Sequence, residues 1–151
     1  MSRASLFLTV ILSASMFAAC SSSKSGKTSP DDVNDNIPAA QAGSELGDVY
    51  YDFDSSSLSS SAQDTLKANA KWLVSNSKGA QVEGHCDERG TNEYNLALGE
   101  RRARSAYDYL KTVGVAKDKL STISYGEELP LDNGHDEAAW SKNRRAHFAV
   151  K

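Results

Sequence analysis

The stretch GHCDERGTNEYNLALGERRA, residues 84–103, joins a polar loop flanked by glycines to the start of a long amphipathic helix. We expect this helix to begin near Asn92, to run through Leu110 and to stop at Gly114, a residue type that suits the position after a helix end. At 100° per residue one stripe forms, which comprises Leu96, Gly99, Ala103, Ala106, Tyr107, Leu110 and Val113. Gly99 costs about 1 kcal/mol of helix propensity there, which indicates that another backbone approaches closely.

The arginines of this helix fall on different faces. Arg101 and Arg104 fall on the polar side and are expected to be solvated, whereas Arg102 falls on the edge of the buried stripe. A buried charge needs a partner. From the spacing alone, that partner is either an internal carboxylate or the carboxylate of a ligand, and the internal salt bridge is the favoured alternative.

Outward from this stretch, strands and helices interleave from about Asp48 to Lys151. Alternating apolar residues predict strands over 49–54, 81–83, 120–125 and 146–150. A helix after residue 60 can begin with a capping box, Ser60 with Gln63 or Ser61 with Asp64, and would bury Ala62, Leu66, Ala70, Leu73 and Val74. A short helix is expected over 136–142. This order predicts an α/β fold, a two-layer sandwich with helices on one face of a mixed sheet of about four strands.

Composition narrows the classes of function. The 151 residues are 39% hydrophobic and 25% charged, which is typical of one soluble globular domain. The formal net charge is −3, so the basic excess that duplex nucleic-acid binders carry is missing. Two cysteines cannot form a disulfide framework that holds a small fold together.

The N-terminal residues have the features of a targeting signal. Arg3 precedes an apolar run from Leu6 to Met16 that is too short to span a membrane. Residues 17–20, Phe-Ala-Ala-Cys, then resemble the lipobox of bacterial lipoproteins. The resemblance implies cleavage before Cys20 and attachment of acyl chains to it, and Ser21 after the cysteine implies sorting to the outer membrane. An ordinary secreted protein with an unpaired thiol is the alternative.

A polar segment separates this signal from the folded part. Residues 21–47 are rich in Ser, Asp, Asn, Ala and Gly and show no helical or strand period. Such a coil has a root-mean-square span of roughly 27–31 Å. We therefore expect a signal peptide at 1–19, the lipidated Cys20 with a flexible tether at 20–47, and a folded domain at 48–151.

The loop from Gly84 to Thr91 has the composition of a binding site. It leads to a helix N-terminus, whose free N–H groups suit a carboxylate, and Asp87 adds a negative charge beside it. Neighbouring acceptors for a cation and an anion suit a zwitterion, such as the ammonium and carboxylate of an amino acid. The alternative is that Asp87 only accepts hydrogen bonds from the amides of its own loop.

Several motifs, in order, resemble the OmpA-like peptidoglycan-binding domain family. They are residues 49–54 (VYYDFD), 84–91 (GHCDERGT), 93–95 (EYN), 98–103 (LGERRA), 124–128 (SYGEE) and 143–146 (NRRA). They cover nearly the whole folded part. With the lipobox, they are most similar to the lipoprotein members of that family that belong to the Tol-Pal system.

The resemblance implies a fold, a ligand and the residues that hold it. In the family, helices pack on one side of a sheet, and a cleft binds the diaminopimelate of uncrosslinked peptidoglycan stem peptides without cutting them or using a cofactor. Matched by motif, Asp87 would take the ammonium and Arg102 the carboxylate of that amino-acid end. Phe53, Asp54 and Leu98 would line the cleft. On this basis the ligand role of Arg102 becomes the favoured one.

The resemblance also implies a location and partners. The protein would be anchored in the inner leaflet of the outer membrane with its domain in the periplasm, in contact with TolB and, as a further candidate, TolA. It would tie the membrane to the wall and support constriction at division. The alternative within the family is a lipoprotein that binds the wall without Tol partners.

Two other kinds of site are disfavoured. A catalytic site would use Cys86 as nucleophile with His85, His135 or His147 as base, but adjacent residues seldom aim their side chains at one point. A metal site around His85, Cys86 and Asp87 lacks the i, i+4 or C-x-x-C spacing of such sites. The aromatic residues are interpreted as core or edge residues rather than as a stacking platform for nucleic acid.

Overall fold

A computed structural model of the chain describes residues 45–151. The signal peptide, Cys20 and nearly all of the tether that the sequence predicts lie outside the described residues. The elements are β1 (Val49–Tyr50), α1 (Ser60–Ser75), β2 (Ala80–His85), α2 (Asn92–Thr112), the 3-10 turn η1 (Lys117–Lys119), β3 (Leu120–Gly126), α3 (Glu137–Asn143) and β4 (Arg145–Val150). Within residues 45–151, no helix is long and apolar enough to cross a membrane.

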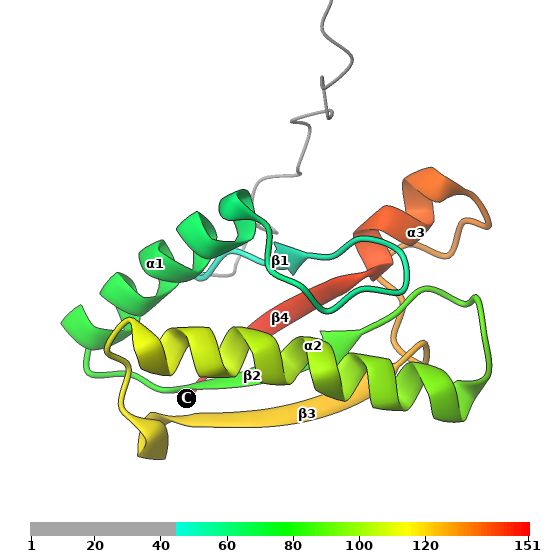
Figure 1. Cartoon of the computed structure of the whole chain (residues 1–151). Coiled ribbons are helices and arrows are strands. Elements are labelled where there is room, and N and C mark those ends of the chain that lie inside the picture. The colour runs from blue at the N-terminus through cyan, green and yellow to red at the C-terminus, as the bar shows by residue number, and fades with distance from the viewer. Residues whose placement is uncertain (1–44) are drawn as a thin grey trace, which may run out of the picture. The chain divides into compact units, whose positions relative to one another are not determined.

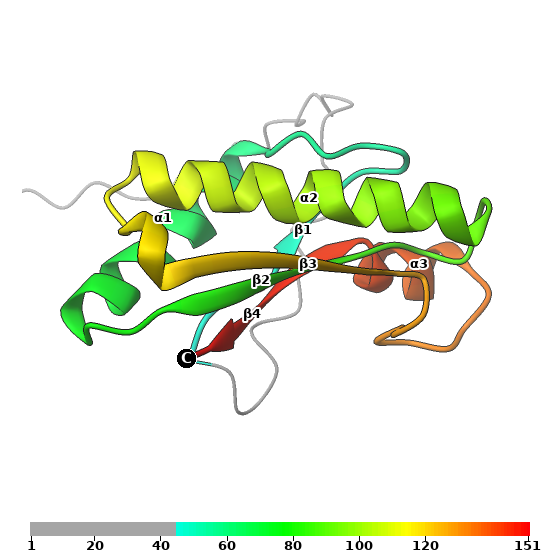
Figure 2. The same cartoon turned by 90° about the horizontal axis from the view of Figure 1, so that it is seen from below.

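The strands form one four-stranded sheet in the order β1-β4-β2-β3. β2 and β3 run parallel, while β4 is antiparallel to both β1 and β2. α1 and α2 supply apolar faces to one side of this sheet, and α3 lies at the end where β4 begins (Figures 1 and 2). The predicted two-layer α/β fold with a mixed four-stranded sheet is therefore confirmed.

The core lies between the two long helices and the sheet. Its large, almost fully buried members include Leu66 and Leu73 of α1, Leu110 of α2, Val82 of β2 and Phe148 of β4. The alternation of buried and partly buried residues along much of β2 and β4 follows from the strand period, since successive side chains point to opposite faces.

The first strand is shorter than the alternation predicts. β1 ends at Tyr50, although the Tyr51 amide still donates to the Arg144 carbonyl oxygen, 2.9 Å away. Asp54 has a φ of +52°, which turns the chain away from the sheet, and Phe53 is 59% exposed. The prediction of a strand over 49–54 is therefore wrong in its second half. The apolar ring of Phe53 lies at the surface, where it lines a pocket, and does not pack into the core.

Two details of α1 also differ from the prediction. The helix is capped by Ser59, whose hydroxyl accepts a hydrogen bond from the Ala62 amide at 3.1 Å, rather than by Ser60 or Ser61. Val74 is 58% exposed, whereas its neighbour Leu73 is fully buried. The helix turns by about 100° between them, and this carries Val74 past the edge of the buried face.

The two ends of α2 follow the prediction. At its start, the Thr91 hydroxyl accepts from the Tyr94 amide at 3.2 Å. At its end, Gly114 has a φ of +105°, its amide donates to the Lys111 carbonyl, and the Val115 amide donates to the Leu110 carbonyl. These two bonds form a Schellman motif, which needs a residue that tolerates the left-handed conformation.

Gly99 marks the place where α2 lies against the sheet. A Cβ atom on Gly99 would be 2.3 Å from the Ser124 hydroxyl and 2.9 Å from the Gly84 carbonyl oxygen, and one on Gly84 would be 1.9 Å from the Gly99 carbonyl oxygen. The close backbone approach expected at Gly99 is therefore confirmed. This contact fixes α2 over β2 and β3, and the Arg102 side chain, from the next helical turn, reaches the carbonyl oxygen of His85, the last residue of β2.

Candidate functional site

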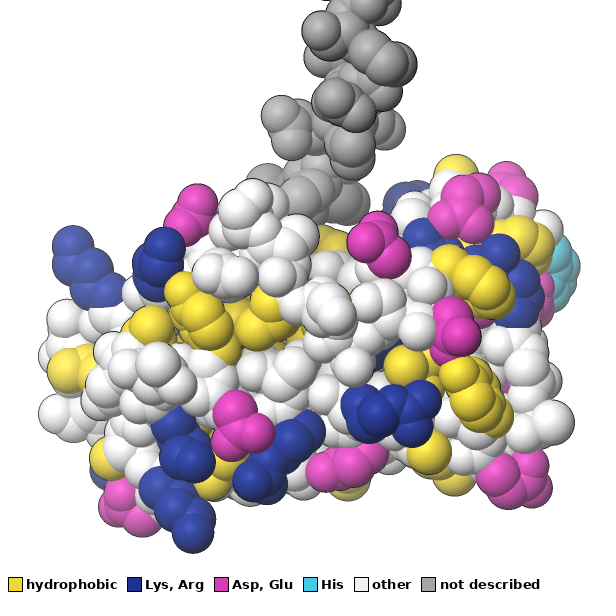
Figure 3. All heavy atoms as spheres, viewed as in Figure 1, with side chains coloured by type: hydrophobic (Ala, Val, Ile, Leu, Met, Phe, Trp, Pro, Cys, Tyr) yellow, Lys and Arg dark blue, Asp and Glu magenta, His cyan; other side chains and the backbone are white. Residues whose placement is uncertain are grey.

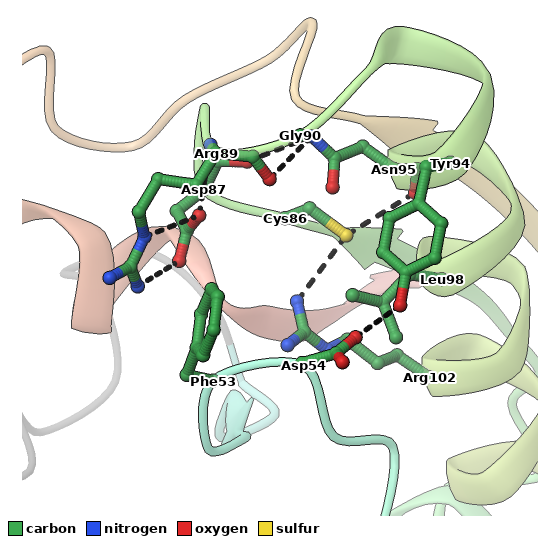
Figure 4. A pocket seen from close by; sticks show the side chains of 10 residues that line it. All are labelled: Phe53, Asp54, Cys86, Asp87, Arg89, Gly90, Tyr94, Asn95, Leu98 and Arg102. Atoms are coloured by element: carbon green, nitrogen blue, oxygen red, sulfur yellow. Dashed lines mark hydrogen bonds and ion pairs between the residues drawn. The ribbon is translucent and has the colours of Figure 1, made fainter.

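A pocket of about 220 Å3 lies where the loop after β2, the turn after β1 and the first turns of α2 meet (Figure 4). The lining residues are Phe53, Asp54, Cys86, Asp87, Arg89, Gly90, Tyr94, Asn95, Leu98 and Arg102. The structure thus brings together all five site residues expected from the sequence, which are Phe53, Asp54, Asp87, Leu98 and Arg102. It adds five that were not expected as ligand residues.

Arg102 forms the floor of the pocket and is only 1% exposed. Its Nε donates to the Ser55 carbonyl oxygen at 2.8 Å, Nη1 to that of His85 at 2.9 Å, and Nη2 to that of Asp52 at 3.0 Å. Nη1 also lies 3.3 Å from the Cys86 sulfur. Burial lowers the pKa of Arg102, but a guanidinium stays protonated in proteins.

The internal salt bridge favoured for Arg102 from spacing alone is wrong. Among residues 45–151, no carboxylate forms an ion pair with this guanidinium, and three backbone carbonyl oxygens take its place. Carbonyl groups orient and solvate the cation without neutralising it. The floor of the pocket therefore keeps a positive charge that favours an anionic group.

Asp87 lies on the wall and is held by two arginines. Its Oδ2 is 2.7 Å from Arg89 Nη2 and 3.2 Å from Arg144 Nη1, while its Oδ1 accepts from Arg89 Nε at 3.2 Å and from the Arg89 amide at 3.1 Å. Burial raises the pKa of Asp87, but these hydrogen bonds outweigh it and leave the pKa below its usual value. The carboxylate, 4% exposed, is thus ionised, and it accepts from a loop amide as well as from side chains.

Asp54 and Tyr94 close the opposite side. Asp54 occupies a left-handed backbone position, which aspartate tolerates better than most residues, and its carboxylate accepts a hydrogen bond from the Tyr94 hydroxyl. That hydrogen bond, with a further contribution from burial, raises the pKa of Tyr94. The contact joins the turn after β1 to the first turn of α2 across the mouth of the pocket (Figure 4).

Arg89 was not expected from the sequence as a site residue. Its guanidinium carbon lies 4.1 Å from the centre of the Phe53 ring and 4.2 Å from the centre of the Trp140 ring. Both separations are within the range of cation–π contacts. Trp140 comes from α3, about fifty residues further along the chain, so no local pattern around Arg89 could have indicated this arrangement.

Cys86 is buried at the back of the pocket. Its thiol donates to the Asn95 carbonyl oxygen at 3.3 Å, and the Asn95 side-chain amide donates to the carbonyl oxygens of Asp87 and Arg89 and to Glu127. Burial raises the pKa of Cys86, which keeps the thiol protonated and therefore a poor nucleophile.

The histidines proposed as bases for a catalytic site are engaged elsewhere. The His85 ring lies 5.5 Å from that of Tyr125, His135 pairs with Glu88 at 2.8 Å, and His147 pairs with Asp48 at 2.8 Å. In the part of the chain that the structure describes, no group of three or more His, Cys, Asp or Glu side chains could hold a metal ion.

The pocket combines opposite charges with apolar walls. Two carboxylates, Asp54 and Asp87, lie near a guanidinium floor, and Leu98 and Phe53 supply apolar surface. Hydrophobic, basic and acidic side chains also lie close together on the surface at the end of the molecule where α3 is found (Figure 3). Such a site can accept a small ligand that carries an ammonium and a carboxylate.

Comparison with known proteins shows which family has a sequence like that of this pocket. Residues 50–144, which include every residue of the pocket, match the OmpA family. A peptidoglycan-associated lipoprotein of Mesorhizobium japonicum is 47% identical over 137 residues, covering 85% of this chain and 82% of its own. One from Pseudomonas aeruginosa is 38% identical and covers 94% of each chain.

Solved structures agree. The crystal structure of the peptidoglycan-associated lipoprotein from Burkholderia pseudomallei is 42% identical with a TM-score of 0.66, covering 69% of this chain and 89% of that one. The C-terminal domain of Helicobacter pylori MotB, 20% identical with a TM-score of 0.63 over 68% of this chain and 81% of that one, shares the fold. On this sequence and structural evidence, the chain belongs to the OmpA family.

Proposed function

We propose that this protein binds peptidoglycan without cleaving it and that the pocket takes the diaminopimelate end of uncrosslinked stem peptides. The observation that carries the proposal is the meeting of Asp54, Asp87 and Arg102 on one pocket of about 220 Å3. The names of its relatives, peptidoglycan-associated lipoproteins, support it.

The assignment of roles follows from charge. The side-chain end of diaminopimelate carries an ammonium and a carboxylate. Arg102 offers the carboxylate a buried guanidinium, in which one N–H of Nη2 is left over after the bond to the Asp52 carbonyl and one N–H of Nη1 reaches only a weak sulfur acceptor. Asp87 and Asp54 offer carboxylates to the ammonium, and Leu98 and Phe53 contact the methylene chain.

The N-terminal residues extend the proposal to the membrane. We assign residues 1–19 to a signal peptide, Cys20 to lipidation, residues 20–47 to a tether and residues 48–151 to the wall-binding domain. More than one acyl chain makes an effectively permanent anchor. The protein would thus be held in the inner leaflet of the outer membrane with its domain in the periplasm.

We further propose that it acts in the Tol-Pal system, with TolB and, as a further candidate, TolA as partners, and supports envelope integrity and constriction at cell division. The second candidate is a wall-binding scaffold of the same family that has no Tol partner. Co-purification of TolB with the protein from a cross-linked envelope fraction favours the first, and its absence from a fraction that still contains peptidoglycan favours the second.

Calorimetric titration of the purified protein with stem peptides tests the central proposal. A peptide with diaminopimelate should bind, and one with lysine in its place should bind at least roughly tenfold more weakly, because lysine lacks the carboxylate for Arg102. Asp54→Asn should weaken binding of the first peptide to a similar degree. Asparagine tolerates the left-handed backbone at this exposed position, so the fold should be kept.

A matched variant makes this result specific. Asp64→Asn removes another exposed carboxylate, on α1, whose ion pair within residues 45–151 is with Lys67 at 2.8 Å, and should leave binding unchanged. Equal affinity of the wild type for the two peptides, or equal effects of the two aspartate variants, would refute the assignment of the pocket.

A further inference from the structure

Arg89 occupies the carboxylate that the proposed ligand needs. Asp87 has four donors around its two oxygens: the Arg89 amide, Nε and Nη2, together with Arg144 Nη1. A carboxylate offers about four lone-pair positions, so these bonds leave no ready acceptor for a further cation. An ammonium can therefore reach Asp87 only if one of the two arginines withdraws.

The two arginines differ in how firmly they are held. The Arg144 side chain is buried, and it also donates to the Tyr51 carbonyl oxygen at 3.1 Å and to Glu137 at 2.5 Å. The Arg89 side chain is 31% exposed, and its remaining contacts are the faces of Phe53 and Trp140 and a longer approach of 3.5 Å to Glu137. Arg89 is thus the one that can swing towards solvent without unpairing a buried backbone group.

We propose that Arg89 is a resident cation of this pocket, whose guanidinium pairs with Asp87 in the empty protein and is exchanged for the ammonium of the ligand. This inference rests on the proposed function. The pairing keeps the buried Asp87 carboxylate compensated while no ligand is bound, since an unpaired buried charge is costly. The pairing also selects among ligands. Only a ligand with its own cationic group can replace Arg89 and keep the negative charge of Asp87 paired.

The exchange makes Arg89 a determinant of specificity. A ligand with a carboxylate but no ammonium gains nothing from the withdrawal of Arg89. A ligand with both groups replaces one ion pair with another and also uses the Arg102 floor. Removing the Arg89 guanidinium should therefore favour ligands with an ammonium and leave those without one unaffected.

Calorimetry with two synthetic stem peptides tests this inference. One ends in meso-diaminopimelate, and the other in 2-aminopimelate, which keeps the distal carboxylate but lacks the distal amine. Arg89→Gln in the purified protein should bind the first peptide roughly 3- to 10-fold more tightly than the wild type, as expected for loss of one competing, partly exposed ion pair with its cation–π contacts. Its affinity for the second peptide should not change.

Two further variants serve as controls. Arg104→Gln removes a comparable arginine of α2 that pairs with Asp108 at 3.0 Å, and it should bind both peptides as the wild type does. Arg89→Lys keeps a charge but loses the bidentate contact with Asp87, and it should give an intermediate affinity. Circular dichroism and the urea midpoint would establish that each variant is folded.

The outcomes separate this inference from the proposed function. Wild-type binding with a weaker or unchanged affinity in folded Arg89→Gln overturns the resident-cation role and leaves the binding function standing. Binding by Arg89→Gln alone supports it strongly. Binding by neither protein overturns both.

Discussion

Burial of His85 should make the stability of this protein depend on pH in a way that can be calculated. The side chain is 2% exposed, and within residues 45–151 neither of its ring nitrogens makes a hydrogen bond of ordinary length, although Nε2 lies 4.0 Å from Glu83 Oε2. Burial lowers the pKa of His85 to about 3, and the positive charges of Arg145 and His147 act in the same direction, against a smaller opposing contribution from the Leu129 backbone.

The magnitude follows from linkage. In the unfolded chain the pKa of His85 is about 6.5, so between this value and about 3 the unfolded state binds a proton that the folded state does not. Stability therefore falls as pH falls through this window, with a slope approaching about 1.4 kcal/mol per pH unit. At about pH 5 the loss relative to about pH 8 is roughly 2 kcal/mol from this residue alone.

His85→Phe should remove this contribution. Phenylalanine keeps a ring beside Tyr125, 5.5 Å away, and cannot take up a proton. Urea unfolding at about pH 5 and about pH 8 should show that the variant gains roughly 2 kcal/mol on the wild type at the lower pH relative to the higher one. If wild type and variant lost the same free energy of unfolding between these two conditions, the reasoning from burial would be refuted.

His147→Gln is a control of opposite sign. The hydrogen bond that His147 donates to the Asp48 carboxylate raises the pKa of His147 above 6.5, so this residue contributes stability that is fully present below 6.5 and lost as pH rises through the raised value. Its removal should destabilise the protein at low pH and matter little at high pH.

Two further predictions concern packing. Gly84→Ala should cost about 3 kcal/mol of unfolding free energy, because its Cβ would lie 1.9 Å from the Gly99 carbonyl oxygen and α2 would have to move off the sheet; a urea midpoint equal to that of the wild type would contradict this contact. Arg102→Ala should cost a comparable amount, about 3 kcal/mol, because it leaves three carbonyl oxygens without their donor, and the same urea titration, set against the exposed Arg101→Ala, would show it.

The fold could be predicted from the sequence because periodicity reports burial. Most of the predicted stripe along α2 is buried, although Leu96 at its start is 36% exposed, and the glycine at the end of the helix and the alternation in β4 also follow the expected patterns. Prediction failed where a residue left the pattern for a local reason. The alternation continues through Phe53, but β1 ends at Tyr50 and the chain turns, with Asp54 in the left-handed conformation, and no periodicity encodes such a turn.

The pocket could be located from the sequence, but the partners within it could not. Loop composition and family resemblance pointed to Asp87 and Arg102, and both line the pocket. The groups that hold Arg102 are backbone carbonyls, which every residue possesses and no residue type signals. The position of the Arg89 guanidinium involves a contact with the Trp140 ring of α3. The two residues are far apart in the sequence, so this contact is visible only in the folded chain.

These partners decide how the pocket would work. Asp87 is paired with Arg89, Asp54 with Tyr94, and the donors of Arg102 face carbonyl oxygens, so the site is largely satisfied without a ligand. A ligand then exchanges one set of polar contacts for another, and the net gain from any single contact is small. Affinity must therefore come from a ligand that pairs with the Asp87 carboxylate and the Arg102 guanidinium at the same time. A zwitterionic end group does this, whereas a simple amine or a simple carboxylate leaves one of the exchanges uncompensated.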